Sequence, residues 1–189
     1  NVSDYHSEAE GDALALGIRQ AQAVFDRVEA IPQPTIAAIN GHAVGAGLQV
    51  ALACDFRIAA RGVKLGLSDV KLGIVPALGA TTRLPRLIGI ARSKELILQG
   101  DLITADRALE IGMVNQVVEE DSLGRVVKEL AEKLASRAPL AMIAAKSLLN
   151  DAATLEEVAS TQSRLIKSAD ALEGISAFFE KRTPNFHGS

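Results

Sequence analysis

The chain has 189 residues, 48% of them hydrophobic, and a formal net charge of -3. This length and apolar content suffice for one domain with a large core and for an appended helical part. The acidic balance disfavours a general nucleic-acid binder, and no apolar run approaches the ~20 residues of a membrane span.

Cysteine use points to the compartment. The single cysteine, Cys54, lies in an apolar helical pattern and cannot form a disulfide within the chain, which fits a reducing compartment. We therefore expect a cytoplasmic location. An organellar location stays open, because the chain begins with Asn1 instead of Met and any targeting peptide would lie upstream.

The first two thirds of the chain predict alternating helices and strands. Ser7–Asp12 is polar and predicts a surface loop, and Ala13–Glu29 carries an apolar stripe at helical spacing. Such alternation favours an α/β fold. The strands predicted after it are Thr35–Asn40, Asp55–Ala60, Val63–Leu67 and Val114–Val118, and the helices are one from Leu48, Leu87–Leu98 with a stop at Gly100, and Ala105–Ile111 with Thr104 as its cap.

From Asp121 onward the pattern is almost entirely helical. Thr154 and Glu157 form a capping-box pattern, while Asp170 with Glu173 suggests a fresh cap before a last helix. We therefore predict an α/β core over residues 1–120 and a helical region over residues 121–189. The apolar stripes that predict its helices cover Ser122–Ser136, Pro139–Leu149, Leu155–Leu172 and a last helix that ends at Lys181.

A glycine-rich turn stands between a strand and a helix in Pro34–Asp55, PTIAAINGHAVGAGLQVALACD. The apolar run stops at Gly41, small residues follow at Gly45–Gly47, and a helical pattern begins at Leu48. Such a turn can aim free backbone N–H groups at an incoming oxygen, and donors fixed before the reaction stabilise an oxyanion best. Glycine also serves ordinary tight turns, so the turn alone is weak evidence.

This stretch resembles the signature of the crotonase superfamily, also called the enoyl-CoA hydratase/isomerase family. The resemblance implies an α/β fold with a crotonase-like ββα spiral core, incomplete at the N-terminus, and a helical region that packs subunits into trimers, often paired into hexamers. Asn1–Asp4 is similar to the tail of the family's preceding segment, which carries the second oxyanion donor and much of the CoA-binding surface. The likeness continues in the family's order over Leu65–Asp69, Leu72–Pro76, Gly79, Thr82–Leu84, Ala105–Val118 and Phe179–Phe186.

The resemblance also implies the site residues. The backbone N–H of Ala46 corresponds to one arm of an oxyanion hole, which stabilises the enolate of a thioester. Hydratases of the family use two glutamates, and Gln49 and Asp69 occupy those positions here. Gln cannot take a proton from water, and the shorter Asp shifts the carboxylate, where about 1 Å can cost roughly a hundredfold in rate.

Structural alternatives stay open for both positions. Ser68-Asp69 is ordinary turn chemistry, and Gln49 on an apolar helix could satisfy buried backbone groups. A one-base isomerisation, in which Asp69 carries one proton between carbons, also remains open.

Four further positions carry less information. Several relatives with other reactions have Asp where this chain has Ala77, which disfavours a hydrolase, a dienoyl isomerase or a ring-closing synthase. Leu78 is bulkier than expected and predicts a reshaped acyl pocket. Lys181 matches a position that contacts CoA phosphate in relatives. A lysine at the C-terminal end of a helix can also be there because it interacts favourably with the negative end of the helix dipole. His42 is expected to be structural, and it forms no metal spacing with the other histidines.

Three hypotheses follow from the sequence. The first is an enzyme that hydrates or isomerises an enoyl-CoA thioester, with no metal and no cofactor beyond the CoA of its substrate, as a homotrimer or hexamer without nucleic-acid or membrane partners. The second is a non-catalytic acyl-CoA-binding or carrier homologue, which Gln49 favours. The third is a structural oligomerisation fragment.

Overall fold

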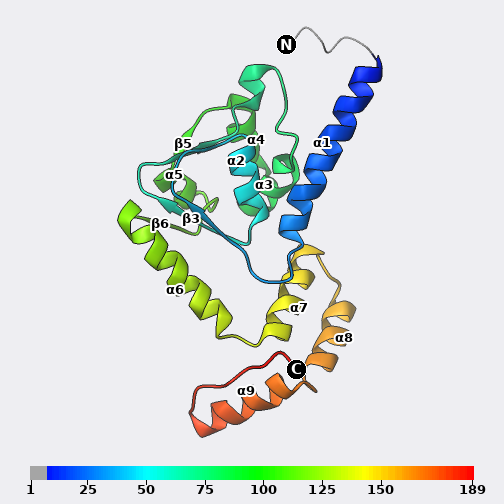
Figure 1. Ribbon diagram of the computed structural model, residues 1–189, viewed down its shortest axis with the longest axis vertical. Coiled ribbons are helices and arrows are strands. Elements are labelled where there is room, and N and C mark those ends of the chain that lie inside the picture. Colours follow the sequence, from blue (N-terminus) through cyan, green and yellow to red (C-terminus); the bar gives the residue numbers. More distant parts are fainter. Residues whose placement is uncertain (1–7) are drawn as a thin grey trace. The chain divides into compact units, whose positions relative to one another are not determined.

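The computed structural model describes the backbone of residues 8–189 and the side chains from Asp12 onward (Figure 1). The predicted resemblance of Asn1–Asp4 to the tail of an upstream segment therefore lies outside the described residues. The chain divides into two compact units. One extends through Glu29 and resumes over Ile36–Gly124, and the other comprises Ala30–Thr35 and Arg125–Ser189.

The first unit is of mixed α/β type. The helix α1 packs against α2, and two short 3₁₀ turns, η2 and η3, follow strands β4 and β6 in the chain. The elements in chain order are α1 (Glu8–Glu29), β1 (Ile36–Ile39), β2 (Ala43–Val44), α2 (Ala46–Ala53), β3 (Phe56–Ala60), β4 (Lys64–Gly66), η2 (Asp69–Leu72), α3 (Ala80–Ile88), α4 (Ile90–Gln99), β5 (Ile103–Thr104), α5 (Ala105–Glu110), β6 (Gln116–Val118) and η3 (Glu120–Ser122).

Two three-stranded sheets organise this unit. In the order β1-β3-β6 both pairs are parallel, with Ile36 opposite Phe56 and Ile58 opposite Gln116. In the order β2-β4-β5 the first pair is parallel and the second antiparallel. Strand β3 is buried almost throughout, as expected for the central strand of a parallel sheet. The largest fully buried apolar side chains of this unit include Leu48, Leu65, Leu67, Leu84 and Met113.

A buried arginine holds the C-terminal end of α2. The guanidinium of Arg57 donates to the carbonyl oxygens of Met113 at 2.8 Å, Ala51 at 3.4 Å and Asp55 at 3.3 Å, and also to that of Cys54. Burial lowers the pKa of Arg57 from its ordinary value. A cation at a helix C-terminus is favourable because it faces the negative end of the helix dipole, so Arg57 stabilises the helix whose other end carries the glycine turn.

Most predicted elements of the first unit are confirmed. The Thr104 hydroxyl caps α5 by accepting a hydrogen bond from Arg107 N at 3.2 Å, and Gly100 ends α4 in the left-handed conformation. The predicted loop Ser7–Asp12 is wrong from Glu8 onward, because α1 begins there. Acidic residues are favourable in the first turn of a helix, so this polar stretch extends the helix.

The prediction failed for the segment after Gly79. Helix α3 was missed, because Gly79 and Pro85 are residues that usually interrupt helices, yet Pro85 lies inside it. The predicted helix from Leu87 is also wrong at its start: α3 ends at Ile88, Gly89 adopts a φ of 78°, and α4 begins at Ile90. The two-residue strands β2 and β5 were missed as well, since such short pairings leave no periodic pattern.

The second unit is helical, and its elements are α6 (Leu123–Ala135), α7 (Pro139–Asn150), α8 (Leu155–Leu165) and α9 (Ala169–Glu180). The predicted capping box is confirmed: Thr154 Oγ1 accepts from Glu157 N, and Glu157 Oε2 accepts from Thr154 N at 2.7 Å. The predicted cap at Asp170 is wrong. Ser168 caps α9 by accepting from Ala171 N at 3.1 Å, and the predicted stripe through Leu172 is interrupted between α8 and α9.

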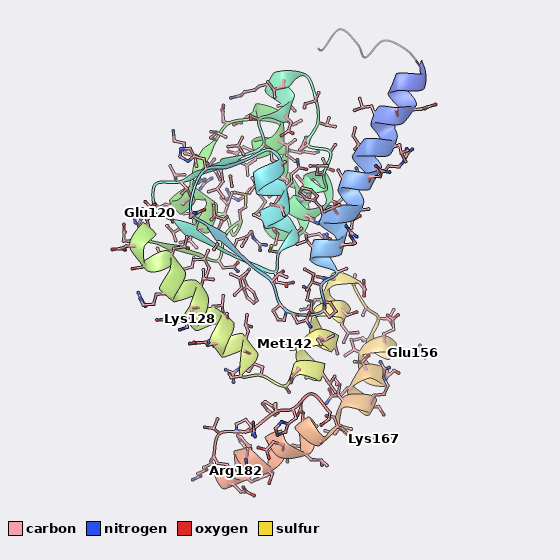
Figure 2. All side chains as sticks on the ribbon, in the orientation of Figure 1. Glu120, Lys128, Met142, Glu156, Lys167 and Arg182 are labelled. Carbon is pink, nitrogen blue, oxygen red and sulfur yellow. The ribbon has the colours of Figure 1, made fainter. Side chains whose placement is uncertain are left out.

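Asp170 instead fastens the C-terminal segment onto α9. Its buried carboxylate accepts hydrogen bonds from His187 N at 2.7 Å and Gly188 N at 2.9 Å. Nearby, Glu173 forms a two-pronged ion pair with Arg182, whose side chain is labelled in Figure 2, at 2.6 and 2.8 Å. The carboxylates of α9 therefore fix the chain that follows this helix.

Candidate active site

An apolar cavity of about 820 Å³ lies within the first unit. It brings together Ala46, Gln49 and Asp69, three of the four side-chain or backbone positions predicted for the site, from the start of α2, the middle of α2 and the start of η2. Its lining residues are Leu14, Ile18, Ala46, Gln49, Asp69, Gly73, Ile74, Val75, Ala77 and Leu78.

The glycine turn presents a backbone donor at this cavity. Gly45 adopts φ 55° and ψ −120°, which favours glycine, and its N–H is tied to Gly66 O at 3.0 Å. The first backbone bond of α2 runs from Gln49 N to Gly45 O, so the N–H of Ala46 precedes the helical ladder. No acceptor among the backbone and side-chain groups that the structure describes binds it. This donor can bind an anionic oxygen.

Gln49 has a fixed orientation. The residue is 2% exposed, and its Oε1 accepts hydrogen bonds from Leu78 N at 2.7 Å and Ala80 N at 3.3 Å. Because both partners are donors, the atom that faces them must be the amide oxygen. Nothing in the described part of the chain accepts from its Nε2, so the NH₂ group is the end left for the cavity. Gln49 therefore satisfies two backbone N–H groups, as its structural interpretation predicts. The same side chain also lines the cavity.

Unlike the Gln49 oxygen, one carboxylate oxygen of Asp69 accepts no hydrogen bond from the described residues. Asp69 begins η2, whose turn is closed by hydrogen bonds from Gly73 N to Val70 O and from Ile74 N to Asp69 O, each 3.2 Å. Its Oδ2 is buried, and no donor among the described residues reaches it. A buried carboxylate oxygen without donors is poorly solvated, which suits a group that must take a proton from a bound reactant.

Apolar side chains form the remaining walls. Leu14 and Ile18 lie four residues apart on one face of α1, and Ile74 and Val75 are exposed apolar residues on the loop after η2. Leu78, predicted to alter the acyl pocket, is part of the lining. Such walls suit the alkyl part of a ligand, while the polar groups select its head.

Besides its contact with Gln49 of α2, the loop at residues 77–79 is held from α1 and α3. Gln22 Nε2 on α1 donates to Ala77 O at 2.6 Å, and Arg83 Nη1 on α3 donates to Leu78 O at 3.1 Å. The buried Arg83 also pairs with Glu29 of α1 at 2.9 Å. A Cβ at Gly79, whose φ is 104°, would lie 1.9 Å from Arg83 Nη1, so only glycine fits there.

Sequence reasoning missed Gln22 and Arg83. One signal was available for each. Gln22 lies four residues after Ile18, on the same face of the predicted first helix, and Arg83 lies within one of the motifs that carry the family resemblance. Neither residue type stands out, because both are common on solvated helix surfaces.

The other predicted residues lie elsewhere. Lys181 belongs to the second unit, where it is exposed and ends α9 in the left-handed conformation with φ 54°. His42 Nδ1 accepts from Lys64 N at 3.0 Å, so this side chain satisfies a backbone donor at the start of β4. Among the described residues no three His, Cys, Asp or Glu side chains gather to hold a metal ion, and none of the described helices combines the length and apolarity needed to cross a membrane.

A family comparison decides the assignment. The sequence model of the enoyl-CoA hydratase/isomerase family matches residues 7–189. The chain belongs to this family. Its fold is the crotonase fold: a crystal structure of enoyl-CoA hydratase from Bacillus anthracis aligns with a TM-score of 0.90 at 42% identity, over 94% of this chain and 71% of that one. The structure of Pseudomonas aeruginosa DspI aligns with a TM-score of 0.89 at 33% identity, over 99% and 73%.

Curated members of the enoyl-CoA hydratase/isomerase family are similar in sequence. An enoyl-CoA isomerase/hydratase of Mycosarcoma maydis is 42% identical over 87% of this chain and 63% of its own length. The crotonyl-CoA hydratase of Syntrophomonas wolfei is 41% identical over 87% and 66%. The chain thus spans slightly less than two thirds of these two relatives.

Proposed function

We propose that the protein acts on an enoyl-CoA thioester, by hydration or by double-bond isomerisation through an enolate. The observation that carries this proposal is the sharing of one apolar cavity by a backbone donor without an acceptor, at Ala46, and a carboxylate oxygen without a donor, Asp69 Oδ2. The names of the relatives support the same reaction class.

Ala46 would bind the thioester oxygen. Negative charge develops on this oxygen when the α-carbon loses a proton or the β-carbon gains a nucleophile, and a preorganised N–H stabilises that charge, typically by about 3 kcal/mol. The family resemblance places a second donor upstream of the first helix, outside the residues described here.

Asp69 would move the proton. In isomerisation Oδ2 takes a proton from the α-carbon, the C=C bond shifts toward the thioester, and the same proton returns to the γ-carbon. In hydration the water oxygen bonds to the β-carbon as Asp69 takes its proton, and Asp69 then delivers that proton to the α-carbon. Both sequences balance with one carboxylate.

Gln49 would position the reactants. Its NH₂ group can donate to the oxygen of a bound water or to that of the thioester, but it cannot accept a proton. The non-catalytic carrier hypothesis gains no support from the relatives, which are named as hydratases and isomerases.

We also propose a division of labour along the chain, with the α/β core over residues 1–120 carrying the chemistry and the region over 121–189 carrying assembly into a homotrimer or hexamer. Exposed apolar residues of α9 support the second part: Phe178 is 78% and Phe179 is 77% exposed, and surface this apolar usually marks an interaction site. Lys181 would contact a CoA phosphate as a point charge, and no cofactor beyond the CoA of the substrate is proposed.

The test is turnover of crotonyl-CoA and of a 3-enoyl-CoA by the full-length protein, with mass spectrometry of the products. A product heavier by one water supports hydration, and a shifted double bond at unchanged mass supports isomerisation. If both thioesters bind and are recovered unchanged, the proposed enzyme is wrong and a carrier is left.

A further inference from the structure

One peptide group in the cavity wall is held from both of its edges. Ala77 O accepts from Gln22 Nε2 at 2.6 Å, and Leu78 N donates to Gln49 Oε1 at 2.7 Å. This carbonyl and this N–H belong to the same planar trans peptide and point in opposite directions. Gln22 of α1 and Gln49 of α2 therefore form hydrogen bonds to opposite edges of one planar peptide group.

The orientation of that peptide, together with the longer contact from Ala80 N at 3.3 Å, decides which end of Gln49 faces the cavity. A primary amide has one accepting end and one donating end. While the Leu78 N–H faces Gln49, the amide oxygen must meet it and the NH₂ group is left for the cavity. If the peptide turned over, the Ala77 carbonyl would face Gln49 instead and would favour the reversed amide, which presents its oxygen to the cavity.

We propose that Gln22 is a positioning residue that prevents this reversal and so keeps Gln49 a hydrogen-bond donor in the cavity. The proposal rests on the proposed function, since it assigns Gln22 to the same site. Arg83 fixes the following carbonyl, Leu78 O, at 3.1 Å. Among the described side chains, Gln22 is the one that donates to Ala77 O, the carbonyl of the peptide whose N–H makes the shorter contact with Gln49. Gln22 lies one helical turn beyond Ile18, so α1 supplies both an apolar wall and the anchor of the polar group opposite.

Such an anchor matters because position 49 is Gln. A glutamate would accept from Leu78 N and Ala80 N with one carboxylate oxygen and present an equivalent oxygen to the cavity. Because both oxygens are acceptors, turning the carboxylate over would not change what faces the cavity. The need for Gln22 should therefore disappear when Gln49 is replaced by Glu. If Gln22 has a purely structural role, its substitution should lower kcat equally whether position 49 is Gln or Glu.

The experiment is a double-mutant cycle in the full-length protein. Gln22→Met keeps the length of the side chain and removes the donor, Gln22→Lys keeps a donor of similar reach, and Gln20→Met is the matched control on the exposed side of α1. With Gln49 present, Gln22→Met is expected to lower kcat for crotonyl-CoA by roughly tenfold to a hundredfold, with KM little changed. Gln22→Lys should recover most of this loss, and Gln20→Met should have no effect.

In the Gln49→Glu background the same Gln22→Met change is expected to alter kcat by less than about twofold, because no amide remains to be oriented. An equal loss of kcat in both backgrounds would overturn the proposal, since Gln22 would then act on stability or packing alone.

Hydrogen exchange separates this proposal from the proposed function. Gln22→Met should raise the exchange rate of the Leu78 amide by roughly tenfold over wild type, whereas Gln20→Met should leave it unchanged. If the wild type turns over no enoyl-CoA, the proposed function fails and the exchange measurement alone decides about Gln22. Unchanged protection of Leu78 in Gln22→Met contradicts the positioning role whatever the activity.

Discussion

Gln49 Oε1 accepts a hydrogen bond from Leu78 N at 2.7 Å, so the acceptor end of this amide faces the protein and its NH₂ group is left for the cavity. The family resemblance implies that hydratases carry a carboxylate at this position. The enzyme proposed here therefore depends on one carboxylate, Asp69.

Gln49→Glu tests that dependence. A glutamate can accept the same two hydrogen bonds, from Leu78 N and Ala80 N, and adds a second carboxylate to the cavity that already holds Asp69. We expect hydration of crotonyl-CoA to accelerate by about a hundredfold, the lower end of the range for one general base, as measured by kcat at saturating substrate. A slower reaction would mean that the donor end of Gln49 is itself required.

Asp69→Asn tests the base. The substitution removes the proton acceptor, and we expect kcat to fall by about a hundredfold to ten-thousandfold. Because Oδ2 makes no hydrogen bond within the described residues, losing its charge should leave the melting temperature unchanged or raise it. Asp101→Asn, which breaks a surface pair with Lys71, is the control and should keep full activity; wild-type turnover by Asp69→Asn would remove the base from the proposal.

Arg57→Met tests the support beneath the glycine turn. The buried guanidinium donates to four backbone carbonyls, and methionine would remove these charged donors from a buried site, so we expect a loss of about 3 kcal/mol in the free energy of unfolding. Chemical denaturation measures this loss. Arg61→Met is the matched control, because the ion pairs of Arg61 with Asp106 and Glu119 are solvent-exposed and should matter far less.

A pH dependence is expected at the C-terminal segment. Hydrogen bonds from Arg182 and from Asn185 N lower the pKa of Glu173 from 4.5 to about 2. A lowered pKa means that this stabilisation is complete above pH 4.5 and is lost as the pH falls toward 2. Glu180 adds to the loss in the same direction, because Arg182 lowers its pKa too.

The measurement for this prediction is exchange of the Asn185 amide as a function of pH, after correction for intrinsic exchange. Protection should decline between pH 4.5 and 2 in the wild type. In Glu173→Gln it should be weak and nearly independent of pH over that window. An identical decline in both proteins would show that Glu173 does not hold this segment.

Much of the fold could be predicted from local pattern. The strand before Gly41, the cap at Thr104 and the capping box at Thr154 each follow from a few neighbouring residues, and the structure confirms them. Helix α3 could not be predicted this way, because tertiary contacts such as those of Arg83 outweigh the helix-breaking tendency of Gly79 and Pro85.

For the candidate site, too, the residues within local motifs could be predicted, and the contacts between residues distant in sequence could not. The family resemblance carried Ala46, Gln49 and Asp69, and these three share one cavity. The contact of Gln22 with Ala77 spans 55 positions, and that of Arg83 with Asp26 spans 57. No periodicity records such pairings. The donor polarity of Gln49 likewise follows from contacts with Leu78 N and Ala80 N, 29 and 31 positions away, and not from its neighbours in sequence.

The most direct test of the account is the product formed from crotonyl-CoA by the full-length wild-type protein and by Asp69→Asn, identified by mass spectrometry alongside loss of the conjugated thioester's absorbance. If Asp69 moves the proton, wild type forms a water adduct, or an isomer from a 3-enoyl-CoA, and Asp69→Asn forms almost none. Bound but unchanged thioester in both proteins, or equal turnover in both, would contradict a reaction run by the single carboxylate of this cavity.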